Sequence, residues 1–326
     1  MLTLKENIKN MYLHQPIDRM PGPGEGEYCV YPVNGFLERP ANNSGGTDWF
    51  GCHWELLEGT DAPAPDVHHH VLDDICDWQE VVQFPDLETW DWENAKLVDH
   101  ISDIDRANNL VNIVVCNGMF ERLHVLMGFE DALCALITEK EAVAAFFDAI
   151  VDYKIALIAK LKEHYNPDVI TFHDDWGTQK ALFFSPALWK ELIKPRMKKI
   201  IDFTHQCGIG FIMHSCGKLD DIIEEVCEIG VDTLQCMDIN DLERALKISQ
   251  GRMNIQASVH TQDFVAKEES GTLTEEMVRQ TVRSEFMTLG ATGHYFPFLF
   301  ITPDSTWYEK ITLEEFLTCR EALAHS

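Results

Sequence analysis

A histidine and a cysteine stand two residues apart where an apolar run ends, in FIMHSCG at residues 211–217. If the strand continues that far, both side chains point to the same side, and Gly217 lets the chain turn away. Imidazole plus thiolate favours zinc among the available ions, so one interpretation of His214 and Cys216 is a metal site. A buried cysteine beside a hydrogen-bonded core histidine is a second interpretation. A cysteine nucleophile with a histidine base is a third, although neighbours on one strand seldom reach the geometry it needs.

Other residues that could do chemistry also follow apolar runs. His173, Asp174 and Asp175 end one run, Asp238 ends a second and His260 ends a third. In a barrel of alternating strands and helices, the carboxyl ends of the strands form the active face. That architecture would bring these five side chains to the same face as His214 and Cys216.

The elements that must position these residues are short apolar runs alternating with long amphipathic segments from about residue 110 onward. The runs are LVNIVVCNG (110–118), DVITFHDDWG (168–177), IGFIMHSCG (209–217), VDTLQCMD (231–238), MNIQASVH (253–260) and GHYFPFLF (293–300). Near-continuous hydrophobicity is typical of strands buried on both faces of a parallel sheet. Six repeats, with one or two further strands in the first hundred residues, predict an α/β fold of the (β/α)8 TIM-barrel type. No glycine-rich phosphate loop follows a strand, which disfavours a dinucleotide-binding fold.

Helix ends can be predicted from capping patterns. Thr138 with Glu141 predicts the start of a long helix that Pro167 stops, and Thr312 with Glu315 predicts the start of the last helix. Ser185 followed by Pro186 predicts another start, with Gly208 at its end.

The chain divides by composition. Residues 1–105 are rich in glycine, proline and asparagine, with short β-like pieces such as Tyr28 to Val33, and are expected to form an irregular cap or extension packed on the barrel. Residues 106–326 are expected to form the main body of the barrel. The length suits one structural domain overall.

Charge and composition exclude several partners. The formal net charge is −28, and such a field repels nucleic acid and anionic membranes. No apolar stretch approaches the length of a membrane span, and the first residues lack the apolar core of a secretion signal, which predicts a cytoplasmic protein. The ten cysteines are scattered and are expected to be free thiols.

Longer motifs give a resemblance to a family. The chain carries DDWGTQ at 174–179, a Ser-Pro-opened segment that runs to KPR at 194–196, and HSCG at 214–217. In this combination it resembles the uroporphyrinogen decarboxylase superfamily, over most of residues 112–323 and including GMFERLHVLMGFEDAL and ASVHTQDF. An upstream piece, TDWFGCHWELLEGTDAPAP with QFPDLETW, is similar to the N-terminal region of the methyltransferase-type members.

Two branches of that superfamily are relevant. True decarboxylases carry an arginine-rich N-terminal signature for the carboxylates of the tetrapyrrole, whereas this chain has only Arg19 and Arg39 in its first hundred residues. Corrinoid-dependent methyltransferases hold zinc with a His-x-Cys pair and a later cysteine, and His214 and Cys216 match the pair. The later cysteine is missing, because the chain reads HYFPFLFITPDS where that branch has Gly-Cys-Gly. The third ligand therefore stays open among Cys236, Asp238, His260, Glu121 and Asp174.

The resemblance implies a methyltransferase of the O-demethylase type. The expected reaction moves a methyl group from a methoxylated aromatic compound to cob(I)alamin on a partner corrinoid protein, because the chain lacks the corrinoid-binding motif D-x-H-x-x-G. His173 with Asp174 or Asp175 would supply a catalytic acid or orient the donor, although an aspartate at a strand end also commonly braces a loop. Tyr295, Phe296 and Phe298 would line the arene pocket, unless they are core residues.

Other functions stay open on the same barrel. They are transfer from methylcobalamin to a thiol, a uroporphyrinogen decarboxylase-type lyase, and a noncatalytic binding protein. The oligomeric state is also open, with a homodimer as one option.

Overall fold

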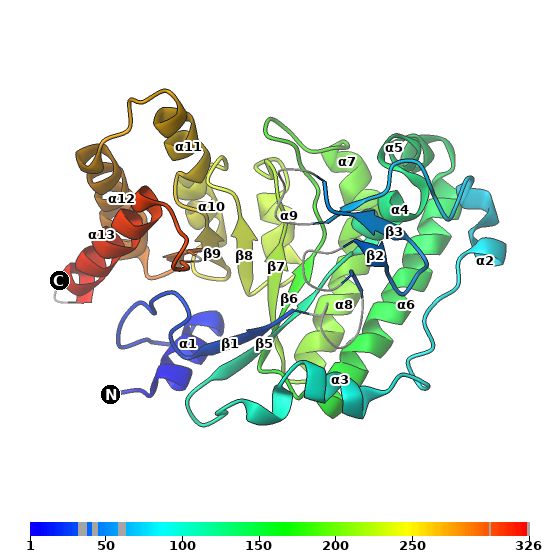
Figure 1. The fold of residues 1–326 in the computed structure, drawn as a ribbon, viewed down its shortest axis with the longest axis horizontal. Coiled ribbons are helices and arrows are strands. Elements are labelled where there is room, and N and C mark those ends of the chain that lie inside the picture. The colour runs from blue at the N-terminus through cyan, green and yellow to red at the C-terminus, as the bar shows by residue number, and fades with distance from the viewer. Residues whose placement is uncertain (32–37, 41–44, 58–62, 300, 325–326) are drawn as a thin grey trace.

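A single curled sheet of parallel strands forms the centre of the molecule. The computed structural model describes residues 1–31, 38–40, 45–57, 63–299 and 301–324. Within them, seven parallel strands pair in the order β1-β5-β6-β7-β8-β9-β10 (Figure 1). The strands are β1 (Glu27–Val30), β5 (Leu110–Val115), β6 (Val169–His173), β7 (Gly210–His214), β8 (Thr233–Cys236), β9 (Asn254–Ala257) and β10 (Tyr295–Pro297). All six predicted runs are therefore strands, and the β-like piece at residue 28 is a seventh.

The predicted α/β class with a barrel-type sheet is confirmed. The parallel order follows the chain from β1 to β10, with a helical crossover between most neighbours, as in a TIM barrel. The described residues give seven strands where eight were expected, and among them β1 and β10 are the two edges of the sheet. Helix α1 (Leu4–Tyr12) lies near both edges, because the centroid of the Tyr12 ring lies 6.0 Å from that of Phe296 on β10 and the Tyr12 hydroxyl donates to Glu27 on β1 at 3.0 Å.

Helices surround the sheet on its outer side (Figure 1). They are α2 (Trp78–Val81), α3 (Trp92–Val98), α4 (Met119–Met127), α5 (Phe129–Thr138), α6 (Lys140–His164), α7 (Pro186–Leu188), α8 (Lys194–Gln206), α9 (Ile223–Glu228), α10 (Leu242–Ser249), α11 (Thr261–Glu269), α12 (Glu275–Leu289) and α13 (Trp307–Ala324). A π-helical turn, Trp189–Ile193, joins α7 to α8. Their apolar faces pack on the outward side chains of the strands, such as Phe172 and Phe211, which stack at 5.7 Å.

One predicted helix start and one predicted helix cap are wrong. Helix α6 begins at Lys140, close to the predicted start, but with no side-chain cap; Thr138 is the last residue of α5, and its hydroxyl donates to the Cys134 carbonyl. The last helix begins at Trp307, and Thr312 lies inside it. The capping box that opens α13 is formed by Thr306 and Glu309. Ser185 does cap α7, where its hydroxyl accepts from the Leu188 N–H.

The first hundred residues do more than cover the barrel. They contribute β1, which pairs in parallel with β5, and a small antiparallel sheet of β2 (Gly46–Thr47), β3 (His53–Glu55) and β4 (Ala64–Pro65). The boundary expected at residues 105 and 106 therefore does not separate the sheet from its cover. The predicted extended piece reaches residue 33, and its positions 32 and 33 lie outside the described residues.

The acidic residues Glu38 and Asp48 are anchored in the interior by a buried group of charges. Glu38, Asp48, Arg122 and Lys154 all have side chains with almost no exposure. Lys154 on α6 donates to the Glu38 carboxylate at 2.7 Å, and Arg122 on α4 donates to Asp48 at 2.6 Å. These bonds tie the N-terminal segment to the helices that follow β5.

None of the helices in the described part of the chain combines the length and the apolarity needed to span a bilayer.

Candidate functional site

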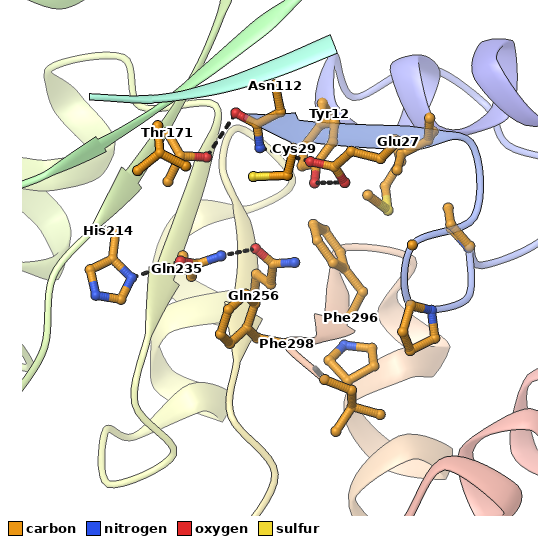
Figure 2. Close-up of a pocket in the computed structure, with 18 of the residues that line it drawn as sticks. Tyr12, Glu27, Cys29, Asn112, Thr171, His214, Gln235, Gln256, Phe296 and Phe298 are labelled. Atoms are coloured by element: carbon orange, nitrogen blue, oxygen red, sulfur yellow. Dashed lines mark hydrogen bonds between the residues drawn. The ribbon is translucent and has the colours of Figure 1, made fainter. Parts of the chain in front are cut away.

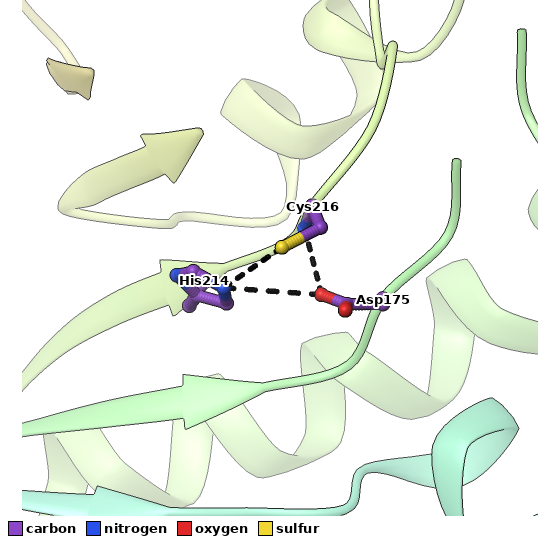
Figure 3. A group of neighbouring side chains, drawn as sticks. All are labelled: Asp175, His214 and Cys216. Carbon is purple, nitrogen blue, oxygen red and sulfur yellow. Dashed lines mark hydrogen bonds and ion pairs between the residues drawn. The ribbon is translucent and has the colours of Figure 1, made fainter. Parts of the chain in front are cut away.

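Three potential metal ligands meet where β6 and β7 end. Ligand atoms of Asp175, His214 and Cys216 all lie within 4.8 Å of one another, and they form the one such group of three or more among the described residues (Figure 3). His214 Nε2 lies 3.4 Å from Cys216 Sγ and 3.9 Å from Asp175 Oδ1. The structure thus places the predicted His-x-Cys pair beside an aspartate that sequence reasoning assigned to acid catalysis.

The register of the sheet explains why Asp175 joins the pair. His173 and His214 are partners across β6 and β7, so the residues two positions further on are also neighbours. Asp175 Oδ1 accepts the backbone N–H of Cys216 at 2.7 Å, which holds the two strand ends together. Gly217 then turns the chain away with φ +86°, and a Cβ there would meet the Gly177 carbonyl at 2.1 Å. A larger residue at 217 would therefore displace the ligand loop.

The three side chains fit a zinc ion in donor type and spacing. Ligand atoms around tetrahedral zinc at about 2.0–2.3 Å are separated by about 3.4–3.7 Å, close to the separations seen here. His214 Nδ1 lies 2.7 Å from Gln235 Oε1, and Nε2 is directed at Cys216 and Asp175. With the proton on Nδ1 donated to Gln235, Nε2 would be available to bind a metal. Such an orienting bond on the second ring nitrogen is usual for a metal-binding histidine.

The two aspartates of the DDWG motif have different environments. Asp174 is fully buried and accepts from the backbone N–H of Glu121 at 2.9 Å and from the Trp176 indole at 2.9 Å, so it braces the start of α4. Burial, and then the charge of Glu121, raise the pKa of Asp174 to about 7. Asp175 is the partly exposed one that faces His214. The sequence suggested a role for at least one of them, and their contacts favour Asp175.

Glu121 and Arg39 lie close enough to the three ligands for their charges to act on Asp175 and Cys216. Arg39 donates to Glu121 Oε1 at 3.1 Å and to Asn117 Oδ1 at 3.0 Å. Glu121 Oε2 is buried, and no residue in the described ranges donates to it. Sequence reasoning included Glu121 among the open ligands, whereas the described geometry leaves it outside the group of three. From the sequence, Arg39 was noted only as one of two arginines in the first hundred residues, and no local pattern indicated its place beside Glu121.

Burial controls the protonation of the remaining groups. The His173 ring stacks on His214 at 4.1 Å, and burial followed by the His214 charge holds the pKa of His173 well below its usual range. His173 is therefore neutral near pH 7 and suited to hydrogen bonding rather than to proton donation as an imidazolium. Burial, and then Asp175, raise the pKa of Cys216 to about 12, so the thiol alone is a poor nucleophile.

The other proposed ligands lie apart from the group. Cys236 is buried at the end of β8, and burial raises the pKa of its thiol to about 12. Asp238 accepts the Thr261 N–H at 3.1 Å, and His260 pairs with Glu285 at 2.8 Å. These residues line the face expected from their strand ends, but none belongs to the group of three ligand atoms.

A cavity of about 430 Å³ lies inside the curl of the sheet and reaches His214 (Figure 2). Of the three predicted arene-pocket residues, Phe296 and Phe298 line it, and Phe298 is 41% exposed. Tyr295 points the other way, because its hydroxyl donates to Glu285 and its ring packs on Phe286. Alternation along β10 separates Tyr295 from Phe296, which the sequence alone did not resolve.

Polar side chains from five strands face this cavity. On one side, Asn112 Nδ2 donates to Glu27 Oε1 at 2.7 Å and Thr171 donates to Asn112 Oδ1 at 3.0 Å. On the other side, Gln235 Nε2 donates to Gln256 Oε1 at 2.7 Å (Figure 2). None of the cavity's amide residues was singled out from the sequence, although each stands at an inward position of a predicted strand.

Glu27 gives a testable pH dependence. Burial raises the pKa of this carboxyl above 4.5, against the hydrogen bonds from Asn112 and Tyr12. A carboxyl whose pKa is raised by folding stabilises the protein fully below its unfolded pKa, and this contribution is lost as the pH rises through the folded pKa. Gln at position 27 can accept from Asn112 and donate to the Tyr12 oxygen, and it cannot ionise. We expect Glu27→Gln to gain stability relative to the wild type as the pH is raised from 4.5 towards 8.

Urea denaturation of both proteins at several pH values measures this difference. Glu130→Gln, an exposed change on α5, is the matched control and should keep a constant difference from the wild type across the range. A stability difference between Glu27→Gln and the wild type that does not change with pH would contradict a buried, titrating carboxyl.

Comparisons with known proteins identify the family of the chain and a structure with a similar fold. The model of the uroporphyrinogen decarboxylase (URO-D) family matches residues 48–295, so the chain belongs to that family. A methyltransferase from Methanosarcina mazei superposes with a TM-score of 0.71 at 13% identity, over 99% of this chain and 99% of that one. A glycosylated endo-beta-1,4-xylanase of glycoside hydrolase family 10 from Gloeophyllum trabeum superposes with a TM-score of 0.43 at 11% identity, over 71% of this chain and 82% of that one. A search of curated protein sequences gives no match.

Proposed function

We propose that this protein is a methyltransferase that moves a methyl group from a methoxylated aromatic compound to the cobalt of cob(I)alamin on a partner corrinoid protein. In this proposal a zinc ion is held by Asp175, His214 and Cys216. The observation that carries the proposal is the convergence of these three ligand atoms within 4.8 Å at the carboxyl ends of the strands, above a cavity large enough for one aromatic ring.

Each residue around the ligands has a role that its contacts support. Gln235 orients the His214 ring through Nδ1, and the Cys216 N–H fixes Asp175. A zinc ion bound here would act as a Lewis acid on the oxygen of the methyl donor. Asp174 keeps α4 and the DDWG loop in place through three N–H bonds, which makes it a positioning residue.

In this proposal the cobalt comes from a partner corrinoid protein. The sequence has no D-x-H-x-x-G motif for a corrinoid of its own. The ligands sit at the carboxyl-end face of the sheet, and His214 and Cys216 also line a second cavity of about 350 Å³ beside the first. An open face of this kind is where a partner would present its cofactor.

Decarboxylation is the activity for which the family is named, and the charges near the cavity disfavour it. Holding an octa-anionic tetrapyrrole needs several guanidinium partners. Arg19 pairs with Glu25 at 2.7 Å and Arg39 pairs with Glu121, so both arginines of the first hundred residues are already neutralised.

The test is a methyl-transfer assay with free cob(I)alamin and a panel of methoxylated aromatics. We expect methylcob(III)alamin to form, seen by its absorption spectrum, together with one equivalent of the demethylated phenol. Parallel reactions with methylcobalamin plus a thiol, and with uroporphyrinogen, test the two other activities. Product in either parallel reaction but not in the first would overturn the proposal, and binding without any turnover would indicate a noncatalytic protein.

A further inference from the structure

The cavity inside the sheet is polar along the strands that line it and apolar at the end away from His214. The strand walls are lined by Glu27, Asn112, Thr171, Gln235 and Gln256. Ile8, Met11 and Tyr12 of α1 line the end away from His214, together with Phe296. A volume of about 430 Å³ suits one substituted aromatic ring, with apolar surface for its faces and hydrogen-bonding groups for its substituents.

The hydrogen bonds around the cavity leave specific groups for a ligand. Gln256 uses its Oε1 to accept from Gln235, so its Nε2 is free to donate, and no described residue accepts from it. Glu27 accepts from Tyr12 at 3.0 Å and from Asn112 at 2.7 Å, which leaves further lone pairs on its two oxygens. The cavity thus offers a donor on one side and an acceptor on the other (Figure 2).

No lysine or arginine side chain is placed to balance an anionic ligand in the described part of this cavity, and the charge of a zinc ion on His214 would be offset by its other ligands, Asp175 and the Cys216 thiolate. Among the described residues, no lysine or arginine lines this cavity or the adjoining one, while Glu27, Asp238 and Glu309 do. The segments outside the described residues, 32–37, 41–44, 58–62, 300 and 325–326, contain no lysine or arginine in their sequence. Arg39, at the strand-end face, is engaged by Asn117 and Glu121. Burying a carboxylate without a cationic partner, and next to Glu27, is strongly unfavourable.

We propose that this cavity binds uncharged methoxyphenols, and that it excludes methoxylated aromatics that carry a carboxylate. The proposal rests on the proposed function for the identity of the methyl donor, and on the cavity alone for its charge. Phenolic or alcohol hydroxyls suit the Glu27 acceptor, and ether or hydroxyl oxygens suit the Gln256 donor.

Three ligands that differ only in one substituent test the charge. Vanillyl alcohol, vanillate and vanillylamine share the ring, the methoxy group and the phenol, and carry a neutral, anionic and cationic side group. Isothermal titration calorimetry of the full chain at pH 7, without cobalamin, should give the alcohol the tightest binding and vanillate at least about tenfold weaker binding. Equal or tighter binding of vanillate overturns the proposal. Tighter binding of vanillylamine overturns it as well, in favour of a cationic donor, and no binding of any of the three removes the cavity as the donor site.

Variants assign the effect to particular residues. Glu27→Gln should narrow the affinity ratio between the alcohol and vanillate, whereas Glu130→Gln on the outer surface should leave all affinities unchanged. Gln256→Leu should weaken the alcohol by about tenfold through loss of the N–H donor. An unchanged ratio in Glu27→Gln would overturn the role of Glu27 in the exclusion. Binding is measured without cobalamin, so the two proposals can fail separately. The expected order of affinities without any methyl transfer would overturn the proposed function alone. Methyl transfer without the expected order of affinities would overturn only this inference.

Discussion

Replacing Cys216 by alanine is expected to abolish methyl transfer and to lower zinc affinity by more than about 100-fold, while the fold is kept. Loss of a residue that only orients a ligand already costs about 10–100-fold in metal affinity, so loss of a ligand atom should cost more. Cys216 lies at the end of β7 and is partly exposed, so it contributes little to the core.

Zinc per chain by inductively coupled plasma mass spectrometry, with thermal unfolding as the check on folding, measures this result. His214→Ala should behave in the same way. Cys236→Ala is the matched control, because it removes a buried thiol from the next strand without touching the group of three. Full zinc content and activity in Cys216→Ala would sink the metal site, and loss of zinc in Cys236→Ala alone would move the third ligand to β8.

The second large effect is expected from the buried charges that anchor the N-terminal segment. Glu38 is fully buried and accepts from Lys154 at 2.7 Å and from the Tyr153 hydroxyl at 3.0 Å. Glu38→Gln would remove the negative charge that pairs with the buried Lys154 ammonium, whose other hydrogen bond among the described residues is to the Cys116 carbonyl. Breaking a buried ion pair in this way typically costs about 3–5 kcal/mol of the free energy of unfolding.

The same change should also weaken zinc binding at the candidate site, because Arg39 follows Glu38 directly and pairs with Glu121. We expect chemical denaturation to show the loss of stability and zinc titration to show weaker binding in the remaining folded protein. Glu88→Gln, which breaks the exposed pair with Lys160, is the control and should have little effect. If Glu38→Gln were as stable as the wild type, the buried charges would not be what holds Glu38 and its neighbour Arg39 in place.

The strands were predictable because parallel strands buried on both faces leave an unbroken apolar run, and each of the six runs is a strand. The starts of the helices were less predictable than the strands. Thr312 with Glu315 has the spacing of a capping box, but that spacing also occurs inside a helix, and only the backbone shows that Thr306 is the cap. Similarly, Thr138 ends α5 instead of opening α6.

The site was predictable to the extent that it follows strand alternation. His214 and Cys216 lie together because they are two apart, and Asp175 could have been added from the pairing of His173 with His214. Consecutive residues such as Asp174 and Asp175 could not be separated without knowing which one turns inward. Arg39 and the amide residues of the cavity were missed because long-range packing, rather than any local motif, gives them their positions.

The hydrogen bonds from His214 through Gln235 to Gln256 would be held in one direction by an ion bound to His214. A cation on Nε2 requires the proton on Nδ1, so Gln235 must turn its oxygen to the ring and its amide nitrogen to Gln256. Gln256 then presents a donor to the cavity, whereas a proton on Nε2 would allow both amides to reverse. Binding of the ion and binding of the methyl-donor ligand would therefore be thermodynamically coupled, so that each raises the affinity for the other by the same factor. A protein without the ion would then discriminate less well among ligands in the cavity.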